Sequence, residues 1–84
     1  MEVKITTKYN IKENLYHIEA YDHDGKIIPY ASARLYDTEY EAELAGAILR
    51  FMFSKIEDRK EFNASEFDFN LKAVFRLLGT PGKW

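Results

Sequence analysis

The sequence YDTEYEAELAGAILRFMFSKI at residues 36–56 decides the fold of this chain. Thr38, followed three residues later by Glu41, is a capping box, in which the two side chains satisfy backbone N–H groups at a helix start. Between residues 44 and 53 only Arg50 is charged. A helix that begins at this cap is therefore apolar almost all the way round, and it needs cover on more than one side.

We predict a helix over residues 38–56 that packs with one side on a sheet. Its other side requires a second helix, a partner protein or a second copy of the chain. Ala42, Gly46 and Arg50 lie on one row of this helix, and the small residues of the row offer room for the close approach of another backbone. The simpler interpretation is that Gly46 fits one tight packing position.

Three segments before this helix alternate in the way that half-buried strands do: residues 3–9, 15–22 and 26–36. Asp24-Gly25 is a strong hairpin signal between the second and third segments, because glycine accepts the positive φ that such turns need. Pro29 has no N–H to donate, so the third strand is either at a sheet edge or bulged there. The pattern predicts a three-stranded antiparallel meander.

The same alternation assigns the strand residues to two faces. The face under the helix is expected to include Ile18 and Ala20, together with Ile27, Ala31, Ala33 and Leu35, whose small alanines suit a covering helix. The other face is expected to stay open. It carries Lys4, Thr6, Lys8, His17, Glu19, Tyr21, Ile28, Tyr30, Ser32 and Arg34.

Residues 66–77 fit two patterns. Strict alternation indicates a strand, but apolar residues of this segment also fit one face of a helix. The end signals favour the helix, because Asn63 or Ser65 is a good cap, and Gly79 followed by Pro81 is a good stop. We therefore predict an α+β fold of order βββαα, in which a meander packs on a long helix and a second helix follows. The alternative order is βββαβ.

Composition limits the class of protein. The 84 residues are expected to form one domain, 1–84, and 46% hydrophobic with 15% aromatic content argues against disorder. The absence of cysteine excludes disulfides and thiolate chemistry. A net charge of −2 gives no overall attraction for nucleic acid. The polar start and the lack of a long apolar run predict no signal peptide and no membrane span, so we expect a cytoplasmic protein.

The residue types that carry catalysis or bind metals lack the required spacing. Asp22, His23 and Asp24 look like a ligand cluster, but they occupy a hairpin turn, where acidic side chains bond the turn itself. Counted from Asp22, the last ligand position of a calcium loop is Ala33 rather than a glutamate. No phosphate-binding glycine loop and no serine elbow occur. We therefore expect no enzyme activity, no catalytic residue, no metal and no cofactor.

The open sheet face is the candidate binding surface. It mixes tyrosine with lysine and arginine, which anchor protein partners and also stack on bases or meet phosphates. The alternative is that residues with a strand preference simply fill an exposed face. The candidate binding residues are Lys4, Lys8, His17, Tyr21, Tyr30 and Arg34.

The sequence YDTEYEA at residues 36–42, followed by Ala45, resembles the strand-to-helix junction of Apetala-type DNA-binding domains and of their relatives at the N-termini of phage integrases. Over residues 14–52 the resemblance implies a three-stranded sheet on one helix that binds DNA through its exposed face. That face departs from the pattern of those families, because Arg34 is its one arginine, it has no tryptophan, and Glu19 has the wrong sign. A similar junction also resembles that of HicB-like antitoxins. The motif is mostly helix-start chemistry, so it identifies no family.

These patterns predict a small non-enzymatic protein–protein interaction module, such as an adaptor, regulator or inhibitor. A phage or mobile-element accessory protein that acts against a host system fits by analogy of size and shape. The contact surface is expected to be the aromatic sheet face or the surplus apolar side of helix 38–56. The alternative is a nucleic-acid-binding domain that uses the sheet face, and a third reading is a homodimer through the surface of helix 38–56.

Overall fold

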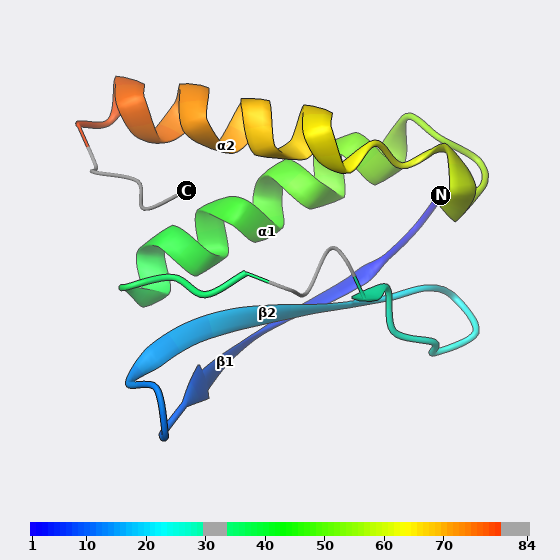
Figure 1. The fold of residues 1–84 in the computed structure, drawn as a ribbon. Coiled ribbons are helices and arrows are strands. Elements are labelled where there is room, and N and C mark those ends of the chain that lie inside the picture. Colours follow the sequence, from blue (N-terminus) through cyan, green and yellow to red (C-terminus); the bar gives the residue numbers. More distant parts are fainter. Residues whose placement is uncertain (30–33, 80–84) are drawn as a thin grey trace.

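The structure, a computed structural model, describes residues 1–29 and 34–79 of the chain. An antiparallel hairpin of two strands forms one layer, and α1 lies between this hairpin and α2 (Figure 1). The α+β class is therefore confirmed. The elements in chain order are β1 (Lys4–Asn10), β2 (Leu15–Tyr21), α1 (Glu39–Ser54), the short 3-10 helix η2 (Arg59–Glu61) and α2 (Ala64–Leu77).

Both helices begin at caps that the sequence indicates. Thr38 Oγ1 accepts a hydrogen bond of 3.1 Å from the N–H of Glu41 at the start of α1. Asn63 Oδ1 accepts one of 3.2 Å from the N–H of Glu66 at the start of α2. Gly79, with a φ of +72°, follows the end of α2. The predicted second helix is therefore confirmed, and the alternative of a fourth strand is wrong.

The faces predicted for the first two strands are confirmed. The strand register pairs Ile5 with Ala20 and Thr7 with Ile18, on the side that faces α1. Ile18 and Ala20 are fully buried there. The opposite side, which we call the open face, is made of Lys4, Thr6 and Lys8 from β1 and of His17, Glu19 and Tyr21 from β2.

The third strand of the predicted meander is not seen among the described residues. Two isolated bridges, Tyr21 with Ile27 and Tyr16 with Tyr36, flank the segment that follows β2. The bridged residues are five positions apart in β2 but nine apart in the other segment, so the two bridges do not share one register. Pro29, which cannot donate to a ladder, lies in this interval. The described sheet therefore has two strands.

The faces predicted for residues 26–36 are wrong where the structure describes them. Directly paired residues share a sheet face, so Tyr36 lies on the α1 side and Ile27 on the open side. Ile28 is accordingly 0% exposed, although the alternation argument placed it on the open face, and Ile27 is 43% exposed. That argument rested on two small alanines within residues 30–33, which lie outside the described residues.

The second helix provides the cover that α1 needs on its other side. Phe53 of α1 stacks on Phe62 with ring centroids 4.7 Å apart, and Phe67 of α2 lies 6.0 Å from Phe62. Leu71 and Phe75 continue the buried face of α2. These side chains join the residues under the sheet in one hydrophobic core, so much of the apolar surface of α1 is buried within the chain itself.

Gly46 marks a close approach between α1 and the hairpin. A Cβ atom at this position would lie 3.1 Å from Cγ2 of Ile5, which is tighter than an ordinary carbon–carbon contact. The interpretation of Gly46 as a tight packing position is therefore confirmed, and the neighbouring group is a β1 side chain.

We expect Gly46→Leu to lower the free energy of unfolding by roughly 1–3 kcal/mol, because the added side chain has to displace Ile5. Ala47→Leu adds a larger side chain at the next, exposed position and should change this free energy by less than about 0.5 kcal/mol. Urea unfolding followed by circular dichroism measures both values. Equal effects of the two substitutions would show that β1 does not pack against Gly46.

Candidate functional site

The open face brings together four of the six candidate binding residues. Lys4 and Lys8 of β1 lie directly across from Tyr21 and His17 of β2 in the hairpin register. This arrangement follows from the unbroken alternation of the two strands, which places every second side chain on one face. Tyr30, a fifth candidate, lies outside the described residues.

Glu19 gathers the polar side chains of the open face. Its Oε1 accepts a hydrogen bond of 2.6 Å from the Tyr21 hydroxyl and lies 3.1 Å from Lys8 Nζ. Its Oε2 lies 3.4 Å from His17 Nε2. The hydrogen bonds from Tyr21 and Lys8 lower the pKa of Glu19 from 4.5 to about 2. In turn, the hydrogen bond to Glu19 raises the pKa of both Lys8 and Tyr21.

These contacts make the open face a polar network that is paired within itself. Glu19 is 20% exposed, and it offsets the charge of Lys8 at the centre of the face. Lys4 is the cation of this face that forms no ion pair with any described residue. A face of this kind holds the hairpin in register, since cross-strand charge pairs stabilise a sheet, but it offers few free groups to a ligand.

We expect acid to weaken the fold through Glu19. Its pKa is lower in the folded chain than its ordinary 4.5, so its stabilising contribution is complete above that pH and is lost as pH falls to about 2. After allowance for solvent screening, this loss is about 1–2 kcal/mol. Glu19→Gln should remove this part of the pH dependence. Urea unfolding at several pH values tests it, and parallel curves for the two proteins would contradict the role of Glu19.

Arg34, the remaining candidate, is not part of the open face. It forms an ion pair with Asp68 of α2. The neighbouring Tyr36 is buried on the α1 side, where burial raises the pKa of its hydroxyl. The prediction placed Arg34 on the open face because it assigned Ala31 and Ala33 to the side under the helix, and alternation then put Arg34 on the opposite side. The bridge of Tyr36 with Tyr16 and the burial of Ile28 show that this assignment of the two faces is inverted. The ion pair of Arg34 with Asp68 therefore links the segment before α1 to α2.

Sequence reasoning missed an exposed apolar row on α2, which we call the α2 row and which consists of Phe69, Ala73 and Leu77. Phe69 is 71% exposed and Leu77 is 87% exposed. Residues four apart lie along one side of a helix, and this side is turned away from the buried Phe67. The sequence signal for this exposed row was the strict alternation of apolar residues through residues 66–77. If this segment is a helix, its buried face cannot hold every second residue, so some of these apolar side chains must be exposed.

A small cleft lies between the two helices. It has a volume of about 250 Å³, and its lining includes Phe51 and Met52 of α1 with Glu66 and Asn70 of α2. The Phe51 ring is exposed, and Lys55 Nζ lies 4.3 Å from its centroid. Both helices therefore present large apolar side chains to solvent.

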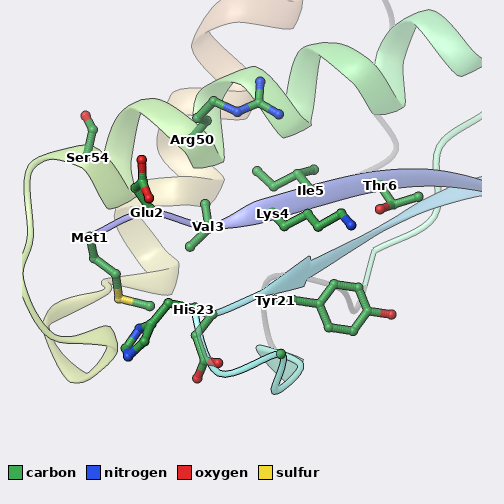
Figure 2. Close-up of a pocket in the computed structure, with 12 residues that line it drawn as sticks. Met1, Glu2, Val3, Lys4, Ile5, Thr6, Tyr21, His23, Arg50 and Ser54 are labelled. Atoms are coloured by element: carbon green, nitrogen blue, oxygen red, sulfur yellow. The ribbon is translucent and has the colours of Figure 1, made fainter.

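A second, larger hollow of about 960 Å³ lies along the first part of β1. Figure 2 shows Arg50 and Ser54 of α1 on one side of the strand, with Tyr21 and His23 on the other side. Lys4 and its neighbours in β1 pass between them. This hollow therefore opens onto the outer edge of the hairpin.

Comparison with protein families, with curated proteins and with solved structures found no match. Among the described residues no helix is both long and apolar enough to cross a membrane. The same residues contain no group of three or more histidine, aspartate or glutamate side chains placed to hold a metal ion.

Proposed function

We propose that this chain is a small non-enzymatic protein–protein interaction module, an adaptor, regulator or inhibitor, that contacts its partner with the α2 row. The observation that carries this proposal is the exposure of Phe69 and Leu77 on one side of a well-capped helix. Large apolar side chains that cluster on a protein surface mark contact sites, and aromatic residues are common anchors there.

The open face supports the alternative, nucleic-acid binding, less well. A nucleic-acid surface needs cations that are free to meet phosphates and rings that are free to stack on bases. Lys8 and Tyr21 both bond Glu19, whose negative charge lies among them. Two of the predicted contacts are therefore already engaged within the chain, and Arg34 is ion-paired on α2.

The experiment is a capture of proteins from the native host on the immobilised chain. The variant Phe69→Ser with Leu77→Ser should lose the captured partner. Ile11→Ser is the matched control, because Ile11 is 83% exposed in the hairpin turn, far along the chain from α2, and it should retain the partner. Equal recovery on both variants would contradict the proposal. Recovery of nucleic acid that is lost at high salt would favour the alternative.

A second copy of the chain is another possible occupant of the α2 row, on a different helix from the homodimer predicted through the surface of helix 38–56. Sedimentation or light scattering separates the two cases. A mass near the 9.9 kDa of one chain leaves the row free for a different protein. A mass of twice this value that returns to one chain in the variant Phe69→Ser with Leu77→Ser would contradict the proposal of a separate partner.

A further inference from the structure

The hydrogen bonds on β2 show which backbone groups of β1 face outward. Tyr16 exchanges bonds of 2.8 and 2.7 Å with Tyr36, on the side of β2 away from β1. In an antiparallel ladder, successive residues direct their backbone groups to opposite sides. The odd-numbered residues of β2 therefore bond β1, and the even-numbered residues of β1 bond β2. Ile5, Thr7 and Tyr9 consequently direct their N–H and C=O groups to the outer edge.

None of the described residues pairs with this outer edge of β1. Its first part lies in the 960 Å³ hollow, between Arg50 and Ser54 of α1 on one side and, on the other, Tyr21 of β2 and His23 of the turn that follows β2 (Figure 2). An edge with unpaired N–H and C=O groups is a template for one more strand. The hollow gives that strand room beside β1.

The charged side chains around this edge determine which net charge an added strand should carry. Arg50 is exposed and forms no ion pair within the described part of the chain, and the same is true of Lys4. Asp22 is occupied by Arg59 at 3.2 Å, so Glu2 is the acidic side chain of the hollow left outside an ion pair. The hollow therefore contains two cations outside ion pairs, Lys4 and Arg50, and one such carboxylate, Glu2.

We propose that the outer edge of β1 binds an extended acidic segment of another protein, which adds to the hairpin as a third strand. The backbone of this segment bonds the outward N–H and C=O groups of Ile5 and Thr7. Successive side chains of an added strand point to opposite faces. An acidic residue opposite Ile5 then meets Arg50 on the α1 side, and an adjacent acidic residue meets Lys4 on the open side.

A second copy of the chain fits this edge poorly. Pairing of two β1 edges brings Lys4, Lys8 and Arg50 of one copy toward the same cations of the other copy, and lysines on an edge strand are a common protection against such pairing. An acidic strand turns the same charges into attractions. This inference concerns a different surface from the α2 row, and it does not depend on the function proposed for that row.

The test uses a capped hexapeptide of sequence TVEEVT and its control TVKKVT, with amide NMR spectra of the full chain. The acidic peptide should shift the amide signals of Ile5 and Thr7 and slow their hydrogen exchange. The exposed double change Arg50→Glu with Lys4→Glu should weaken this binding by at least about tenfold. The same variant should bind TVKKVT better than the natural chain does.

Two further variants separate the edge from other sites. Thr7→Pro removes an outward N–H that β2 does not use, so it should weaken TVEEVT binding while circular dichroism still reports the fold. The α2-row variant Phe69→Ser with Leu77→Ser should bind the peptide unchanged. The inference is overturned if Ile5 and Thr7 signals stay in place, if the two peptides bind equally, or if β1 edges pair in a dimer.

Discussion

Phe67→Ala should lower the free energy of unfolding by about 3–5 kcal/mol, whereas Phe69→Ala, two residues away on the same helix, should change it by less than about 0.5 kcal/mol. Phe67 is buried against Phe62, and removing its ring leaves a cavity where α1 meets α2. Phe69 is exposed, so its removal leaves no cavity.

The loss expected for Phe67→Ala is a large part of the stability of a small domain, which is about 5–15 kcal/mol in total. Urea unfolding followed by circular dichroism gives both free energies, and Leu71→Ala serves as a second buried change on the same face. This pair also tests the helix itself, because a strand over residues 66–77 would place Phe67 and Phe69 on one face. Similar losses for the two phenylalanines would contradict the packing of α2.

The second large effect concerns binding. Once the partner has been captured, Phe69→Ser with Leu77→Ser should raise its dissociation constant by roughly 30-fold or more, which corresponds to about 2 kcal/mol or more for loss of buried anchors. The natural chain and the variant should have the same stability within about 0.5 kcal/mol, because both side chains are exposed. A large loss of affinity at unchanged stability would show that these side chains contact the partner and do not stabilise the fold.

Isothermal titration calorimetry on the purified pair measures this dissociation constant. Ile11→Ser should leave it within a factor of about two, since a small exposed change away from an interface is close to neutral. Lys8→Gln tests the open face in the same assay. If Lys8→Gln raised the dissociation constant more than the α2-row variant does, the contact surface would lie on the sheet, and the proposal would be contradicted.

Local signals in the sequence were sufficient to predict both helices. Thr38 and Asn63 cap them, and Gly79 follows the second, because backbone groups at helix ends need partners from nearby side chains. The alternation of the first two strands was sufficient to place Lys8 and Tyr21 on one face. Such features depend on neighbours in sequence and can be predicted without the rest of the chain.

The remaining features depend on contacts between distant residues. The small Ala31 and Ala33 indicated which face of residues 26–36 lies under the helix, and this local signal assigned Ile28 and Arg34 to the wrong face. The role of Glu19 depends on the cross-strand register, which brings Lys8 within 3.1 Å. The α2 row became visible only when residues 64–77 were known to be helical.

A photo-reactive phenylalanine analogue at position 69, incorporated into the chain in its native host, reports whether the α2 row contacts a partner protein. This analogue should form one discrete adduct with a different protein, and the same analogue at position 11, in the hairpin turn, should not. An adduct that forms from position 21 on the open face but not from position 69 would show that the α2 row is not the contact surface. An adduct at position 69 with a second copy of the chain would show that the row binds no separate partner.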